Sequence, residues 1–331
     1  MKLTRIDSTN ARQPSWQILK EWESVLSKEL NLPIRKDCRL IRFIKSRMNA
    51  YGLSWVYHLF FINKNLNLRF IMAASKKKVC DVNASTIPVI IDFWLTKSDL
   101  QDFYHAYSKV KLILLTNKEV YDFLKAQGCP IPIEHWPLSY PDMHALKKEV
   151  LEKKDFEFTV IGRPNPFFIR LLDEYSSKHP DFEYITNNGD IDHREYVTNR
   201  GRFIAKDTGR ASYLDVIRRT KITCYSTPGI DEGKKGSNGY NQVTPRLFEM
   251  LCNGCQVIGH YPNTSDTLWY NLASIVPNVS SYEEFEVVLD LYRTSQFAYE
   301  AVEAFMCKHY TSQRALSLKE ILARHGISIK R

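Results

Sequence analysis

The first half of the chain alternates continuous apolar runs with stretches in which apolar residues recur at helical spacing. After Ser15, such spacing predicts an amphipathic helix. Three apolar runs predict short buried strands, at residues 68–72, 87–91 and 111–115. A capping box that starts at Thr116 follows the third run and predicts a helix to about Gln127, which Gly128 ends. Strand, cap, helix and glycine in this order are typical of a parallel α/β sheet.

A second α/β series begins near the middle of the chain. Between the two series lie four prolines, Pro130, Pro132, Pro137 and Pro141, followed by a charged helical stretch at 147–154. Residues 158–162 predict a strand that enters a turn. Further strands are expected at 182–185, 222–225 and 256–259, with helices before, between and after them. The pattern predicts two α/β domains, 1–150 and 151–331.

Composition narrows the class of protein. The chain has 331 residues, of which 44% are hydrophobic and 25% charged, and this excludes wholesale disorder and a disulfide scaffold. The net charge of +9 suits a polyanionic partner, which can be nucleic acid, an anionic membrane surface or a phosphorylated substrate. Seven cysteines without regular spacing and an N-terminus without the apolar core of a signal peptide favour the cytoplasm, with membrane contact only peripheral.

The segment 242–255 carries the most specific chemistry. Thr244 suits an N-cap, Pro245 the first helical position and Gly254 the position just after the helix. Arg246 and Glu249 are three apart and therefore share a helix face. The helix N-terminus suits a phosphate, and Glu249 can accept hydrogen bonds from ribose hydroxyls. The alternative is a capped surface helix with a solvated Arg–Glu pair.

The run Thr-Pro-Arg-Leu-Phe-Glu-Met-Leu-Cys-Asn-Gly-Cys, which ends at Cys255, resembles the nucleotide-site helix of GT-B glycosyltransferases. It is most similar to bacterial "glycosyl transferases group 1" and spore-protein-like sugar transferases, and more distantly to phage DNA glucosyltransferases. The resemblance covers about 158–314. It implies two Rossmann-like domains that face each other across a cleft, the first binding the acceptor and the second the nucleotide sugar. The resemblance also allows the last helix to pack back on the first domain.

The resemblance implies a donor site in the second domain. Glu249 would bind the ribose, while Arg246 and Arg163 would lie near the diphosphate; Arg163 also follows a strand at its carboxyl end, where α/β sheets bind ligands. A solvated turn arginine is the alternative for Arg163. Lys206 or Arg210 would supply a second cation. The predicted nucleotide-sugar site comprises Gly162, Arg163, Lys206, Arg210, Ser237, Gly239, Tyr240, Asn241, Thr244, Arg246 and Glu249.

The catalytic prediction comprises Asp92, Arg163 and Arg246. Asn241 stands where the largest retaining branch carries an acidic residue, which puts that retaining chemistry in doubt. An inverting enzyme needs a general base, and Asp92, at the end of an apolar strand, is the candidate. A loop-capping role is its alternative. Three histidines are weaker candidates: His58, His105 and His135.

Metal chemistry is not expected. Asp190 and Asp192 match the DxD pattern of GT-A enzymes, but the pattern is short and lies in a polar stretch. The Cys252–Cys255 pair has no second pair or nearby histidine at ligand spacing. The sequence predicts a metal-independent glycosyltransferase without a cofactor, using a UDP- or GDP-sugar and a saccharide or lipid-linked acceptor in surface polysaccharide or glycolipid assembly. The alternatives are a phage-type DNA glucosyltransferase and a non-catalytic sugar-nucleotide or nucleic-acid binding module.

Overall fold

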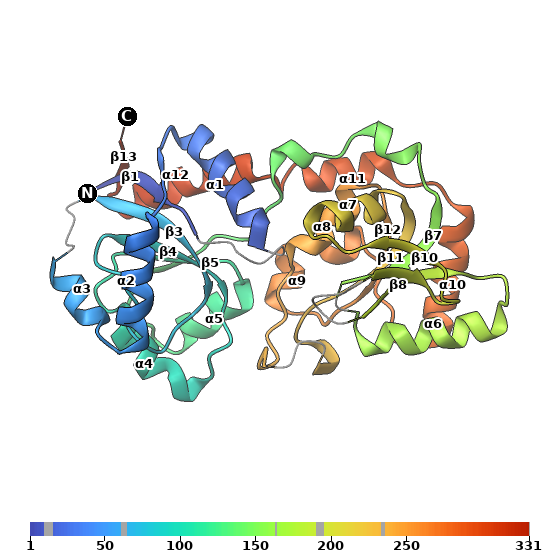
Figure 1. The fold of residues 1–331 in the computed structure, drawn as a ribbon, viewed down its shortest axis with the longest axis horizontal. Coiled ribbons are helices and arrows are strands. Elements are labelled where there is room, and N and C mark those ends of the chain that lie inside the picture. The colour runs from blue at the N-terminus through green and yellow to red at the C-terminus, as the bar shows by residue number, and fades with distance from the viewer. Residues whose placement is uncertain (10–15, 61–64, 163, 190–194, 233–235, 331) are drawn as a thin grey trace. The chain divides into compact units, whose positions relative to one another are not determined.

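The computed structural model describes residues 1–9, 16–162, 164–189, 195–232 and 236–330, except 61–64 and the side chains of 58–60 and 232 (Figure 1). The chain divides into two compact units. Unit 1 comprises Met1–Asp142, Gly236–Tyr240 and Tyr310–Arg331, and unit 2 comprises Met143–Lys235 and Asn241–His309. The division therefore falls at 142/143, before the predicted boundary at 150, and five residues from the loop of the second half belong to unit 1.

Unit 1 is built on a wholly parallel sheet in the order β13-β1-β3-β4-β5-β6, with β2 also paired to β1. Its strands are β1 (Lys2–Asp7), β2 (Ile34–Arg35), β3 (Leu66–Ala73), β4 (Thr86–Asp92), β5 (Ile113–Leu115), β6 (Ile133–His135) and β13 (Ser328–Ile329). Its helices are α1 (Gln17–Leu30), α2 (Arg39–Ala50), α3 (Ser54–Phe60), α4 (Leu100–Tyr107), α5 (Lys118–Ala126) and α12 (Thr311–Arg324). The three predicted strands of the first half are confirmed as β3, β4 and β5.

The helix after β5 begins one residue later than predicted. Asn117 is its N-cap, because the Asn117 Oδ1 accepts from the backbone N–H of Glu119 at 2.8 Å. The Thr116 hydroxyl instead donates to the carbonyl of Ile90 at 3.1 Å and so ties β5 to β4. Ser15, the predicted cap of α1, lies outside the described residues. Apolar side chains of α4 and α5 pack with those of β4, β5 and β6 in one core, in which Phe93 and Phe103 meet edge to face.

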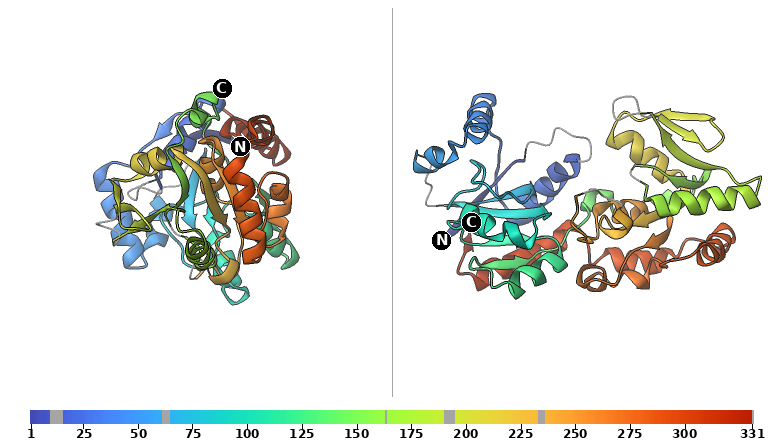
Figure 2. Two further views of the ribbon diagram at one scale, coloured as in Figure 1. Left: turned by 90° about the vertical axis from the view of Figure 1, so that its right-hand side faces the viewer. Right: turned by 90° about the horizontal axis from the view of Figure 1, so that it is seen from below.

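The last helix returns to the first unit. Figures 1 and 2 both show α12, coloured red, beside elements of unit 1, and it contacts α1. The Trp136 indole N–H donates to the Arg314 carbonyl at 2.9 Å, and the Arg314 Nε donates to the Pro137 carbonyl at 3.0 Å. These buried hydrogen bonds join two segments that lie 177 or 178 residues apart in the chain. None of the described helices is both long and apolar enough to cross a lipid bilayer.

Unit 2 has a mixed sheet in the order β10-β9-β8-β7-β11-β12, in which β8, β7, β11 and β12 are parallel. Its strands are β7 (Phe156–Val160), β8 (Tyr184–Asn188), β9 (Glu195–Thr198), β10 (Phe203–Lys206), β11 (Thr220–Ser226) and β12 (Gln256–His260). Its helices are α6 (Pro166–Lys178), α7 (Arg210–Arg218), α8 (Pro245–Cys252), α9 (Ser265–Trp269), α10 (Tyr282–Thr294) and α11 (Tyr299–Met306). The predicted helical stretch at 147–154 is only a 3-10 turn, Lys148–Leu151.

The order of the strands in unit 2 contains a topological switch point, which indicates where a ligand would bind. After β7 the chain forms β8, which pairs with one edge of β7. Only later does it form β11, which pairs with the other edge of β7. The connections therefore leave β7 and β11 in opposite directions, and α/β sheets bind ligands at the carboxyl ends of the strands at such a switch point. The predicted α/β class with two Rossmann-like units is confirmed.

Candidate functional site

At the switch point, the two residues that follow β7 lie beside the first turn of α8. The guanidinium of Arg246, in the first turn of α8, donates from Nη2 to the carbonyl oxygen of Ile161. Gly162 has φ +89°, and its N–H donates to the Asn187 Oδ1 at 2.7 Å. A Cβ on Gly162 would stand 3.3 Å from Arg246 Nη1. Glycine therefore allows both the backbone conformation and the close approach of the cation.

A buried ion pair lies one turn further along α8. Arg210, the first residue of α7, donates from Nη1 to the Oε1 of Glu249. Each of the two side chains is only 9% exposed. Arg210 thus contacts the Glu249 carboxylate, whereas Lys206 is exposed at the end of β10. Which of the two supplies a second cation to the diphosphate stays a prediction. The structure brings Gly162, Arg210, Arg246 and Glu249 together around α8.

Tyr213 belongs to the same group of side chains, although the sequence analysis did not single it out. Its hydroxyl is buried, and no described residue forms a hydrogen bond with it. Burial, and then the nearby Glu249 carboxylate, raise the pKa of Tyr213 above its usual value. The only signal in the sequence was its spacing of three residues from Arg210, because residues three apart share a face when a helix includes both, as α7 does.

Backbone hydrogen bonds fix the entry of the chain into α8. Thr244 occupies the N-cap position as predicted, but its side chain forms no capping bond. Instead its backbone N–H donates to the hydroxyl of the buried Tyr225 at 2.9 Å. The preceding N–H, of Val243, donates to the Oδ2 of the fully buried Asp266 at 2.7 Å. Two buried acceptors thus set where the first turn of α8 begins.

The other predicted features around α8 make contacts within unit 2. Asn241 is buried, and its Oδ1 accepts from the Thr227 hydroxyl at 2.6 Å, so it ties together the two ends of the loop. Gly254 follows the helix with φ +72°, as predicted, and a Cβ there would stand 2.7 Å from Leu151 Cδ2. Cys255 is buried, and burial raises the pKa of its thiol to about 11, which disfavours the thiolate needed for redox or metal chemistry.

Three predicted donor-site residues belong to unit 1, although the sequence analysis placed them in the second domain: Ser237, Gly239 and Tyr240. The Tyr240 ring packs 6.1 Å from Phe93 and 6.0 Å from Phe123 between ring centroids. Its hydroxyl donates to the Leu95 carbonyl at 3.3 Å. Burial of this aromatic ring against unit 1 is the physical reason for the difference. Whether the three residues contact a donor stays a prediction.

The proposed general base, Asp92, ends β4 in unit 1 and is half-buried. Its backbone carbonyl accepts from the Ala74 N–H at 2.9 Å. Among the weaker candidates, His105 is exposed, and burial lowers the pKa of His135 to about 3, so this imidazole is neutral near pH 7. The side chain of His58 lies outside the described part of the chain.

Two sequence motifs also fall on residues that the structure does not describe. These are Arg163, predicted near the diphosphate, and the Asp190–Asp192 pattern. Within the described ranges, no three or more His, Cys, Asp or Glu side chains are grouped so that they could hold a metal ion.

Comparison with known proteins gives distant structural similarity alone. No family model and no curated protein sequence matches the chain. The pneumococcal O-GlcNAc transferase GtfA, solved with UDP and GlcNAc, is 10% identical with a TM-score of 0.47, over 86% of this chain and 60% of that one. The glycosylation-associated protein complex Gap123 from Streptococcus agalactiae is 9% identical with a TM-score of 0.40, over 82% and 55%. The chain thus spans less than two thirds of either, and its function is argued from its own residues.

Proposed function

We propose that the protein is a glycosyltransferase that moves a sugar from a nucleotide-diphosphate sugar to an acceptor hydroxyl. One observation carries this proposal: Arg246 reaches from the first turn of α8 to the backbone of Ile161 and Gly162, at the switch point of the unit 2 sheet. A switch point of this kind is where α/β sheets bind ligands, and a helix N-terminus with an arginine favours an anion. The diphosphate of the donor is the anion that we infer.

Arg246 would serve both binding and catalysis. Its planar guanidinium matches the geometry of phosphate oxygens, and the carbonyl of Ile161 fixes its orientation. When the bond between the sugar and the diphosphate breaks, negative charge develops on the leaving oxygen. A cation already held beside that oxygen stabilises the transition state without reorganisation. Arg163 remains a proposed second contact to the same diphosphate.

Glu249 would hold the ribose. A carboxylate accepts hydrogen bonds and can bind two neighbouring hydroxyls. Arg210 keeps this carboxylate in a fixed position, because the ion pair is buried and one oxygen is already bound. The nucleotide would then lie along α8, with its phosphates at Arg246 and its ribose one turn further at Glu249.

The rest of the reaction is proposed from the resemblance. Asp92 would remove the proton of the acceptor hydroxyl, and the acceptor oxygen would then bond to the anomeric carbon as the diphosphate leaves. The donor would be a UDP- or GDP-sugar, and the acceptor a saccharide or lipid-linked molecule of surface polysaccharide or glycolipid assembly.

The test is slow hydrolysis of nucleotide sugars in the absence of acceptor, preceded by a thermal-shift screen with UDP- and GDP-sugars. We expect one donor to raise the melting temperature and to be hydrolysed. Arg246→Ala should lose most of the hydrolysis, and Glu249→Gln should weaken binding of the donor. Arg219→Ala is the matched control, because Arg219 forms an exposed ion pair with Asp155 elsewhere in unit 2. Binding without hydrolysis or transfer would favour the non-catalytic binding module instead.

A further inference from the structure

Helix α2 packs on unit 1 through its polar side. Lys45 is its buried residue, and the ammonium group donates to Asp37 Oδ2 at 2.6 Å and to Asp81 Oδ1 at 3.1 Å. One turn later, Asn49 Oδ1 accepts from the backbone N–H of Cys80 at 2.9 Å. Charged and polar groups thus anchor the inner face of a helix that lies on the outside of the unit.

The apolar side of the same helix faces outward. Leu40, Phe43 and Ile44, at spacing i, i+3 and i+4, share one face. The segment that leads into α3 adds further exposed apolar residues. In all, six large apolar residues have between 42% and 70% of their surface exposed: Leu40, Phe43, Ile44, Tyr51, Leu53 and Trp55. A surface helix of a globular domain normally buries such a stripe. A group of this size on the outside marks an interaction surface.

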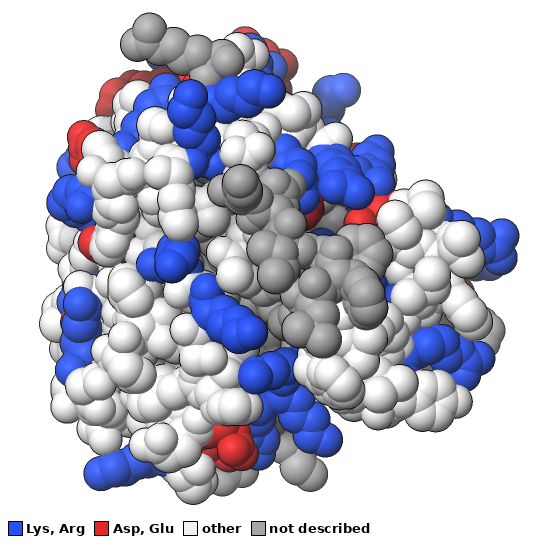
Figure 3. All heavy atoms as spheres, turned by 90° about the vertical axis from the view of Figure 1, so that its left-hand side faces the viewer, with Lys and Arg blue, Asp and Glu red and all other residues white. Residues whose placement is uncertain are grey.

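Basic residues surround these apolar side chains. Between residues 35 and 57 the chain has six Lys or Arg and one acidic residue, Asp37, whose carboxylate is bound by Lys45. The guanidinium of Arg47 lies over the Phe43 ring, 5.2 Å from its centroid. Figure 3 shows the side of unit 1 that carries α2 and α3, and Lys and Arg are spread over it with few Asp or Glu. The partner of this surface must therefore be both apolar and anionic.

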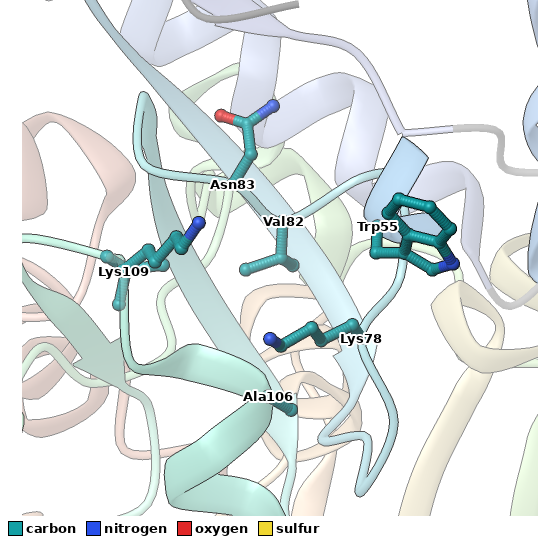
Figure 4. Close-up of a pocket in the computed structure, with 7 residues that line it drawn as sticks. Trp55, Lys78, Val82, Asn83, Ala106 and Lys109 are labelled. Carbon is teal, nitrogen blue, oxygen red and sulfur yellow. The ribbon is translucent and has the colours of Figure 1, made fainter. Parts of the chain in front are cut away.

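A cavity of about 180 Å³ opens between α3, α4 and the loop before β4. Val82, Ala106 and Val110 give it an apolar floor, and in Figure 4 the side chains of Lys78 and Lys109 extend into the space around Val82, with Trp55 at one side. The Ser54 hydroxyl donates to the Lys78 carbonyl at 2.6 Å and so ties this loop to the start of α3. The cavity adjoins the segments that precede β4 and β5, the amino-end edge of the sheet, opposite to the edge at which Asp92 lies.

We propose that the surface formed by α2, the start of α3 and this cavity docks on an anionic lipid bilayer. The six apolar side chains would enter the boundary between headgroups and acyl chains, as amphipathic helices do, while the surrounding arginines meet anionic headgroups. Lys78 and Lys109 would bind a lipid phosphate above the apolar floor of the cavity. The docked surface lies at the amino-end edge, which leaves the carboxyl-end edge of unit 1 open. The proposal does not depend on sugar transfer.

The test is co-sedimentation of the full chain with two kinds of vesicle. One is phosphatidylcholine alone, and the other also contains about 30% of the anionic lipid phosphatidylglycerol. We expect binding to the anionic vesicles alone. Phe43→Ser combined with Ile44→Ser should reduce binding at least about tenfold, because it removes the apolar contact. Val287→Ser combined with Leu291→Ser is the matched control, since both residues are comparably exposed on α10.

Two further double variants separate the contribution of the arginines on α2 to vesicle binding from that of the two lysines at the cavity. Arg39→Glu with Arg47→Glu should abolish the preference for anionic vesicles, and Lys78→Ala with Lys109→Ala should lower binding without affecting the melting temperature. The proposal is wrong if the chain binds neither kind of vesicle. It is equally wrong if Phe43→Ser with Ile44→Ser leaves vesicle binding unchanged but abolishes a concentration-dependent dimer, which would assign this surface to a second copy of the chain.

Discussion

The guanidinium of Arg246 lies against the backbone of Gly162, so that a Cβ on that glycine would stand 3.3 Å from Nη1. This relationship joins the end of β7 to the first turn of α8 across 84 residues of sequence (246 − 162). It also fixes a positive charge at the point of the sheet where the strand order reverses. The proposed donor site depends on this contact. A substitution at Gly162 can disturb the contact while the arginine itself stays in place.

Gly162→Ala should displace the cation. The new methyl group meets the guanidinium, and alanine at φ +89° is strained by about 1–2 kcal/mol. We expect a loss of stability of that order in urea unfolding and at least a roughly tenfold weaker affinity for the nucleotide diphosphate, or about 1.4 kcal/mol. Gly201→Ala is the control, because Gly201 has φ +83° in the same unit with nothing within 4 Å of a Cβ. Equal nucleotide affinity in both variants would contradict the role of this contact.

Arg210→Ala should destabilise the protein by about 3–5 kcal/mol, because it leaves the buried carboxylate of Glu249 without its cation. The double variant Arg210→Met with Glu249→Leu should recover most of this loss, since two apolar side chains of similar volume replace the pair. Urea unfolding of the two variants measures the difference. If the double variant were no more stable than Arg210→Ala, the loss would come from packing rather than from the unpaired charge.

The stability of the protein should respond differently to removal of the hydroxyl group from two buried tyrosines of unit 2. Tyr213→Phe should change stability by less than about 0.5 kcal/mol, because no described residue forms a hydrogen bond with the Tyr213 hydroxyl. Tyr225→Phe should cost about 1–3 kcal/mol, because the Thr244 N–H loses its acceptor. Thermal unfolding of both variants tests this. A large loss in Tyr213→Phe would reveal a partner for its hydroxyl.

Acid should destabilise unit 1 through His135. Burial lowers the pKa of this imidazole to about 3, against about 6.5 in the unfolded chain. Above pH 6.5 the group is neutral in both states and contributes nothing. As the pH falls from 6.5 to 3, the unfolded state binds a proton that the folded state does not, so stability declines.

The pH dependence is measured by urea unfolding at pH 7 and pH 5. The wild type should lose about 2 kcal/mol more than His135→Gln over this interval, at about 1.4 kcal/mol per unit below the unfolded pKa. His105→Gln is the control, because His105 is exposed. The same pH dependence in all three proteins would refute the assignment to His135.

Local patterns in the sequence predicted β3, β4, β5, β7, β8, β11 and β12, the cap position and glycine around α8, and the placing of Arg246 and Glu249 on one helix. These features depend on spacing within a few residues. The Arg210–Glu249 pair spans 39 residues, and the packing of Tyr240 on Phe93 spans 147 (240 − 93), so neither has a local signal. The orientation of α2 could not be predicted either, because its periodicity is the same whether the apolar side or Lys45 faces inward.

The central claim, a nucleotide-diphosphate site at the switch point of unit 2, is tested most directly by titration calorimetry with UDP and with GDP. We predict that one of them binds the wild type at a single site, and that Arg246→Ala weakens this binding at least about tenfold while Arg219→Ala leaves it unchanged. The account would be contradicted if neither nucleotide bound, or if Arg246→Ala bound as tightly as the wild type.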